Sequence, residues 1–228
     1  MDWRFNTIWF EQLNQKTFIN WNFKTKPKES LNLENIEYAI LWHFKHRGIS
    51  FEQLPQSEKL LYLEMNWANF KDLNGIGKYK DLKRLELHYC TKLESDFGIS
   101  SLKNTLEFLH INQSKKFEPT SELMELKKIK VLRLNSCGKL KNLDFLEYFP
   151  NLIDFRFNDT IVESGDLLPI LEHPTIRSVG FMNKRHYNYK STEIMSELDL
   201  KSPDEYKDFV YKGDYSTFKY RNTAANTV

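Results

Sequence analysis

The sequence predicts an α/β solenoid built from stacked repeats, with short parallel strands on its inner side and 3₁₀-like or irregular segments on its convex side. Two observations predict this class. An apolar pattern of the LxxLxL type recurs six times at intervals of 22 to 24 residues, and a three-residue apolar spacing connects the copies. The segments before and after this array do not repeat, so we expect non-repeat caps at both ends.

Each predicted strand carries two apolar residues separated by one other residue. This LxL pattern favours a short strand that buries alternate side chains. A single strand cannot bury its apolar face alone, so neighbouring units must stack into a parallel sheet. The six units are Leu60-Leu63-Met65, Leu82-Leu85-Leu87, Leu106-Leu109-Ile111, Ile129-Leu132-Leu134, Leu152-Phe155-Phe157 and Ile176-Val179-Phe181.

The residues between the predicted strands repeat with a shorter period. After the first unit, apolar side chains follow at Phe70, Leu73, Ile76 and Tyr79, each three residues after the last. A period of three is typical of 3₁₀ turns. Each unit is therefore expected to consist of one inner strand and one outer arc.

The chain divides into three parts around this array. Residues 1–57 are rich in aromatic side chains and are expected to form an N-terminal cap or an irregular first repeat. Within this part, residues 38–44 alternate as in a strand, but residues 33–44 also fit helical spacing, so both remain open. Residues 58–184 hold about six repeats, and residues 185–228 form a C-terminal cap with a helix from Ser202 and a frayed tail from Thr223.

The repeat units resemble leucine-rich repeats, and they are most similar to the short bacterial type with 22-residue units found in internalins. The resemblance covers roughly residues 58–184. The sequence departs from the family at the column where an asparagine ladder is expected. That column reads Ala68, Cys90, Ser114, Cys137 and Thr160, so the loop backbone must find other hydrogen-bond partners.

The two cysteines, Cys90 and Cys137, lie in this same column, two repeats apart. Adjacent parallel strands are about 4.8 Å apart, which places the two Cα atoms roughly 9 to 10 Å from each other. A disulfide requires a Cα separation below about 7 Å. We therefore expect two reduced, buried thiols that fill small sites in the core.

Charge and motifs argue against several classes of function. The 33 basic and 31 acidic residues leave a formal net charge of +2, which offers no overall field toward nucleic acid or a membrane. The amino terminus lacks the apolar run of a secretory signal, which favours a cytoplasmic protein. We found no phosphate-binding loop, metal-ligand spacing or nucleophile motif, so we expect no enzyme activity, no cofactor and no metal. Glu64, Glu86, His88 and His110 fall on inner-strand positions, so a carboxylate and an imidazole could approach each other across one strand gap as an acid and a base, but nothing around them supplies a nucleophile.

The strand residues that alternate with the leucines are expected to point to the concave surface. Large aromatic and arginine side chains gather in these columns, and both types carry binding energy at protein interfaces. The amino-terminal cap could instead fold over the aromatic residues. The candidate partner-binding residues are Tyr62, Glu64, Trp67, Arg84, Glu86, His88, Tyr89, Phe108, His110, Arg133, Asp154 and Arg156.

These features predict a non-enzymatic module that is monomeric before it binds another protein on its concave face. The resemblance to small bacterial leucine-rich-repeat proteins suggests an immunity protein that neutralises a cognate toxin, a step that rests on analogy of fold. The alternatives are an adaptor or substrate-recognition arm linked to an enzyme, and a surface adhesin. The sequence predicts no binding of nucleic acid or membrane.

Overall fold

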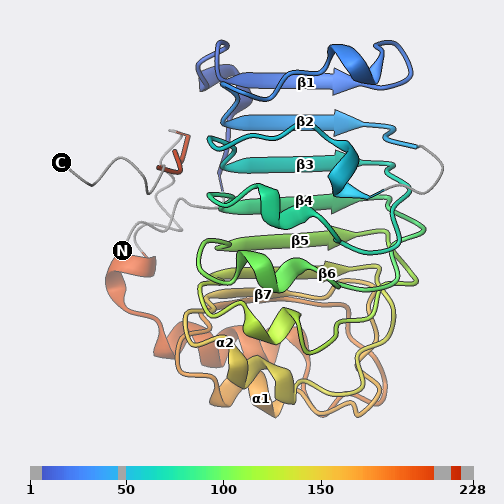
Figure 1. Cartoon of the computed structure of the whole chain (residues 1–228). Coiled ribbons are helices and arrows are strands. Elements are labelled where there is room, and N and C mark those ends of the chain that lie inside the picture. Colours follow the sequence, from blue (N-terminus) through green and yellow to red (C-terminus); the bar gives the residue numbers. More distant parts are fainter. Residues whose placement is uncertain (1–6, 46–49, 208–216, 222–228) are drawn as a thin grey trace.

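The computed structural model describes residues 7–45, 50–207 and 217–221. Its main feature is a single open sheet of eight parallel strands, and the order of the strands in the sheet is their order in the chain (Figure 1). The strands are β1 (Phe18–Asn22), β2 (Tyr38–Trp42), β3 (Tyr62–Asn66), β4 (Arg84–His88), β5 (Phe108–Asn112), β6 (Val131–Asn135), β7 (Asp154–Arg156) and β8 (Ser178–Gly180). The predicted parallel sheet is confirmed.

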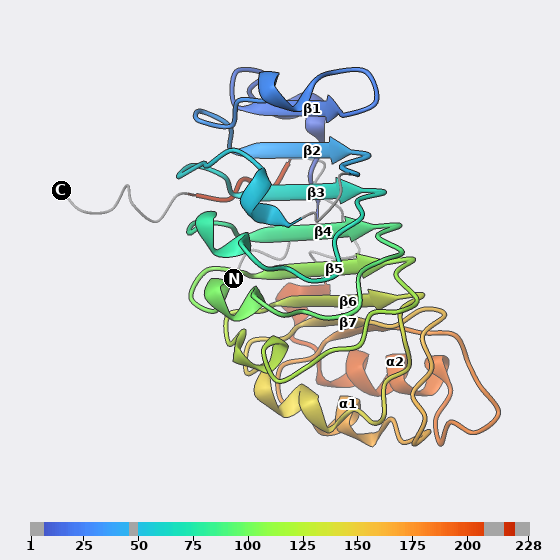
Figure 2. The same cartoon turned by 45° about the vertical axis from the view of Figure 1, so that its right-hand side comes forward.

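Each strand is connected to the next by a return segment, and most of these segments contain a short 3₁₀ helix (Figure 2). The three-residue apolar spacing between units is thereby explained. The 3₁₀ helices are η2 (Phe10–Gln12), η3 (Lys28–Ser30), η4 (Phe51–Gln53), η5 (Ile76–Lys78), η6 (Ile99–Leu102), η7 (Leu123–Glu125) and η8 (Asp144–Tyr148). Helix α1 (Leu168–Glu172) takes the same place between β7 and β8.

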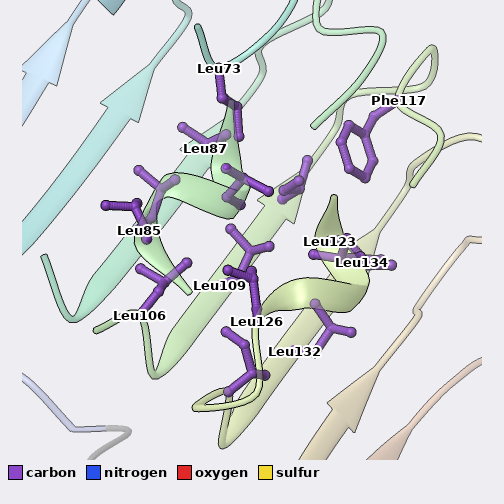
Figure 3. Close-up of a cluster of buried hydrophobic side chains, with 14 of the residues drawn as sticks. Leu73, Leu85, Leu87, Leu106, Leu109, Phe117, Leu123, Leu126, Leu132 and Leu134 are labelled. Carbon is purple, nitrogen blue, oxygen red and sulfur yellow. The ribbon is translucent and has the colours of Figure 1, made fainter. Parts of the chain in front are cut away.

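The core lies between the sheet and the return segments (Figure 3). The second residue of each strand, and the fourth in the six strands of five residues, point into it, because successive side chains of a strand alternate between two faces. Leu85, Leu109, Leu132 and Phe155 are neighbours in register, and all four are completely buried. The return segments fill the other side of the core with residues such as Leu126. The leucines of the repeat thus build one continuous apolar layer.

The sheet begins earlier in the chain than the sequence repeat indicated. Strands β1 and β2 both lie within residues 1–57, and β2 pairs with β3 over Tyr38–Trp42 and Tyr62–Asn66. Of the two alternatives for this segment, the strand predicted from the alternation at residues 38–44 is therefore confirmed, and the helix over residues 33–44 is wrong. Ala39 and Leu41 fill the inward positions of β2 and are completely buried, as the leucines are in later units.

The C-terminal part contains helix α2 (Ser191–Lys201), which packs against β8 and α1. The sequence did not predict this helix. Of the helix expected from Ser202, residues 204–207 are helical, and the part after them lies outside the described residues. The tail from Thr223, expected to fray, also lies outside them. Ile194 and Leu198 of α2 join the main core and close its last unit.

Apart from Ala68, the small residues in the column after the strands support the turns by hydrogen bonds to the main chain. The Cys90 thiol lies 3.8 Å from the Met65 carbonyl oxygen, and the Cys137 thiol lies 3.5 Å from that of Ile111. Thr160 donates in the same way to Leu134 at 2.7 Å. These side chains bond to the loop main chain in place of the asparagines that the repeat family has in this column. Both cysteines are free, as expected, but only Cys90 is fully buried, whereas Cys137 is partly exposed.

Candidate binding surface

The face of the sheet opposite the core presents three columns of side chains, from the first, third and fifth residue of each strand. The first column starts the strands, and it reads Phe18, Tyr38, Tyr62, Arg84, Phe108, Val131, Asp154 and Ser178. The third-residue column reads Asn20, Ile40, Glu64, Glu86, His110, Arg133, Arg156 and Gly180. The fifth-residue column reads Asn22, Trp42, Asn66, His88, Asn112 and Asn135.

Both ends of the chain cover the strand-start part of this face. Leu13 and Phe10 from the amino-terminal segment pack with Tyr62, as does Tyr220 from residues 217–221. Phe218 and Tyr206 pack in the same way over Phe108 and its neighbours. The expectation that Tyr62 and Phe108 form part of an open surface is therefore wrong. Arg84, Glu86 and Asp154 are buried as well.

A buried carboxylate, Glu86, lies at the centre of a polar network on β3, β4 and β5. Arg84 donates to its Oε1 atom from Nε at 2.7 Å, and the Tyr62 hydroxyl lies 3.1 Å from the same oxygen. The other oxygen, Oε2, lies 3.2 Å from His88 Nε2 and 3.3 Å from His110 Nδ1. Four side chains thus surround one carboxylate, and all four are residues of the predicted site.

The charges in this network are fixed by burial and by one another. Burial alone would raise the pKa of Glu86, but the Arg84 guanidinium and the hydrogen bonds from His110 and His88 hold that pKa well below its ordinary value. Burial lowers the pKa of His110 despite the nearby Glu86 carboxylate. Burial, followed by the charges of Glu86 and Glu64, raises the pKa of Tyr62 well above its ordinary value. At neutral pH the network therefore holds an ionised Glu86, a neutral His110 and a protonated Tyr62.

The same cluster is the place to test for a metal ion. Glu86, His88 and His110 each offer one ligand atom, and these three atoms lie within 4.8 Å of one another. However, Asn135 accepts a hydrogen bond on Oδ1 from the Asn158 backbone at 2.9 Å, so its amide nitrogen faces His110 Nε2 at 3.1 Å. That arrangement assigns the His110 proton to Nδ1, which points toward Glu86. The residues therefore fit a hydrogen-bonded network better than a metal site.

An Arg-Asp-Arg cluster continues the site across β6 and β7. Arg133 donates to Asp154 Oδ2 from Nη2 at 2.8 Å, and Arg156 donates to Asp154 Oδ1 from Nε at 2.9 Å. Two guanidinium groups share one buried carboxylate, so this part of the face carries an excess positive charge. The Arg133 guanidinium also lies 5.2 Å from the centre of the Phe108 ring. The sequence predicted all of these residues as site residues, but not that they bind one another.

The opposite, strand-end edge of the face carries a stack of rings. His43 and Trp67 have ring centres 5.2 Å apart, and Trp67 and Tyr89 have ring centres 5.1 Å apart with nearly parallel planes. Trp42 packs against Trp67 at 5.5 Å. The Tyr89 side chain is the outermost of these rings, with 43% of its surface exposed. The predicted aromatic cluster is thus divided, because Trp67 and Tyr89 lie at one edge while Tyr62 and Phe108 lie buried at the other.

The ring stack depends on an unusual backbone conformation. His43, Trp67 and Tyr89 all have a positive φ, near 55 to 60°, and the next units repeat this at Gln113, Ser136 and Asp159. The left-handed turn lets each of the first five residues donate its N–H to the carbonyl of the next unit, as Trp67 does to His88 at 2.9 Å. None of the six residues is glycine, so the residue types did not predict this geometry.

Polar side chains extend this column beyond the rings. Gln113 donates to Ser136 Oγ at 3.0 Å, and Ser136 donates to Asp159 at 3.1 Å. We define the strand-end surface as Trp42, Trp67, Tyr89, Gln113, Ser136 and Asp159. This surface joins rings at one end to a carboxylate at the other.

Comparison with known proteins identifies no relative of this chain. The chain matches no protein-family model and no curated protein. Within the described residues, no helix is long and apolar enough to cross a membrane.

Proposed function

We propose that this chain is a leucine-rich-repeat solenoid that acts as a non-catalytic protein-binding module, and that its strand-end surface contacts the partner. The observation that carries the proposal is the stack of Trp67 and Tyr89 at an edge where Tyr89 is 43% exposed and which the described terminal segments, residues 7–17 and 217–221, do not bury. Large rings held in a fixed position offer contact area at a low entropic cost on binding. The polar half of the surface, at Gln113 and Asp159, supplies hydrogen-bond partners around them.

The size of the surface supports a protein as the partner. The strand-end surface runs from β2 to β7, and these six strands leave five gaps of about 4.8 Å, so the surface is about 24 Å long. That length suits a standard protein interface of about 800 Å² per partner. Cavities of about 460, 340 and 200 Å³ exist, but their walls are formed by return segments and by the α2 region. None of these three cavities is lined by Glu86, His88 or His110, so they do not provide a substrate pocket beside the acid–base pair.

We further propose that the partner is a toxin that this chain neutralises by occluding it. This step rests on analogy with small bacterial proteins of the same repeat type. A buried, fully hydrogen-bonded Glu86 network gives the face rigidity, which suits tight binding to one partner because little order is lost on association.

The experiment begins with capture of the partner by crosslinking in the native cell, followed by affinity measurements with the purified partner. Tyr89→Ala should weaken binding about thirtyfold, equivalent to about 2 kcal/mol for a central aromatic side chain. Tyr148→Ala is the matched control, because Tyr148 is 42% exposed but belongs to η8 on the return side. All variants must melt at the temperature of the parent chain. Loss of binding in Tyr148→Ala with full binding in Tyr89→Ala would place the interface on the return side.

A further inference from the structure

The strand-start part of the sheet face has an apolar lining of its own. Tyr62, Phe108, Val131 and Ile153 are at most 4% exposed, yet they belong to two clusters that are separate from the main core. The main core lies on the other side of the sheet and includes the inward leucines of every strand from β3 to β6. The apolar lining therefore does not complete the main core, and it requires a cover of its own.

Residues 217–221 provide part of that cover as a short extended segment, beside Phe10 and Leu13 of the amino-terminal segment and Tyr206. Its two aromatic side chains, Phe218 and Tyr220, are separated by Lys219, which is exposed. Tyr220 is 7% exposed and packs in the cluster of Tyr38 and Tyr62. Phe218 packs against both clusters, including the one formed by Phe108 and its neighbours. The aromatic residues alternate with exposed basic ones, as expected for an extended chain with one face on a surface.

Specific polar contacts hold this segment in one register. The Tyr220 backbone N–H donates to the Tyr38 hydroxyl at 3.0 Å, and the Phe218 N–H donates to the Thr7 carbonyl at 2.9 Å. Arg84 hydrogen-bonds the Tyr220 side chain, which lies beside it. Arg84 stays paired with Glu86 at the same time, so the floor of the site keeps its charge balance with or without the segment.

We infer that the strand-start half of the sheet face is a binding groove for an extended peptide with aromatic side chains at positions i and i+2, and that residues 217–221 occupy it as an intramolecular ligand. The second aromatic position favours tyrosine, because Arg84 offers a hydrogen bond that phenylalanine cannot accept. The inference goes beyond the function proposed above and does not depend on it, since the strand-end surface lies at the other edge of the sheet.

Covalent connection gives the chain's own segment a local concentration in the millimolar range. A peptide supplied by another protein must therefore compete with it. A partner segment of the same chemistry could enter the groove once residues 217–221 leave. The groove then becomes an additional contact site that opens by exchange of one segment for another.

The test uses the full chain and a fluorescent peptide with the sequence of residues 216–222, Ser-Thr-Phe-Lys-Tyr-Arg-Asn. Tyr220→Ala in the chain weakens the internal ligand but leaves the groove unchanged. The affinity of the Tyr220→Ala chain for the peptide, measured by fluorescence anisotropy, should be about thirtyfold higher than that of the parent chain. A peptide with serine in place of both aromatic residues should not bind. Tyr148→Ala is the matched control in the chain and should bind the peptide as the parent does.

Hydrogen exchange on the unmodified chain gives a second measurement that needs no variant. Excess peptide should speed exchange of the Phe218 and Tyr220 amide protons, because the internal segment is displaced. Equal peptide affinity for the parent and Tyr220→Ala chains, or unchanged exchange at saturating peptide, would overturn the inference and make residues 217–221 a fixed part of the fold. A dimer formed by Tyr220→Ala in sedimentation would also overturn it, in favour of exchange between copies of this chain. No captured partner is used, so these outcomes are independent of the proposed function.

Discussion

Leu132→Ala tests the register of the repeat at the centre of the sheet. Leu132 is completely buried, and its neighbours in register are Leu109 on β5 and Phe155 on β7. The substitution removes three carbon atoms, which costs about 2.4 kcal/mol in transfer free energy at about 0.8 kcal/mol each. A cavity left in the core between the sheet and the return segments adds to this, so we expect a total loss of about 3 to 4 kcal/mol.

The loss should appear in both urea and thermal unfolding followed by circular dichroism. A domain of this size loses about 2 to 4 °C of Tm per kcal/mol, so the Tm should fall by roughly 6 to 16 °C. Leu132→Asp should do more damage, because it buries a charge that has no partner in the apolar layer. Lys128→Ala is the control, since Lys128 is exposed on the neighbouring return segment. A Tm for Leu132→Ala within about 1 °C of the parent would refute the register and the core derived from it.

Three other expectations concern the thiols, the Glu86 network and one turn. Burial raises the pKa of Cys90 and of Cys137 to about 12, so both should resist thiol reagents until the chain unfolds; rapid native labelling, measured by mass spectrometry, would contradict this. The pKa of Glu86 is well below that of the unfolded chain, so its contribution to stability is present above about pH 4.3 and is lost as the pH falls through the folded pKa. Urea midpoints should therefore fall in acid for the parent and much less steeply for Glu86→Gln, and equal slopes would show that the network does not govern acid stability. Gly98→Ala should lower the Tm, because φ is +98° and a Cβ atom would lie 2.7 Å from the Leu73 carbonyl oxygen; an unchanged Tm would mean that this turn adapts at no cost.

The central strands were predictable because their side chains follow one rule in every unit. Leu85, Leu109 and Leu132 recur at nearly equal intervals, and the sheet puts them in register as the repeat implied. Strand β1 could not be found in this way. Its inward residues are Ile19 and Trp21, which are only partly buried at the end of the sheet, so the leucine pattern is absent there.

The candidate site was harder to predict because it depends on contacts between distant parts of the chain. The columns of the sheet face followed from alternation, so Glu86 and His110 were correctly placed side by side. Nothing in the local pattern indicated that Tyr220 would pack near Tyr62 and Tyr38. Two separated aromatic residues in a polar tail give no periodicity, and the contact that buries them is defined only by the folded sheet.

The left-handed turns after the strands have a consequence for any attempt to make this chain more robust. A residue other than glycine in this conformation costs roughly 1 kcal/mol, and six successive units carry one. Selection for thermal tolerance alone should therefore favour glycine or asparagine at positions such as Trp67 and Tyr89. Each such replacement would relax the backbone and remove a ring from the stack. Greater thermal stability and the exposed ring stack therefore make opposing demands on the same positions.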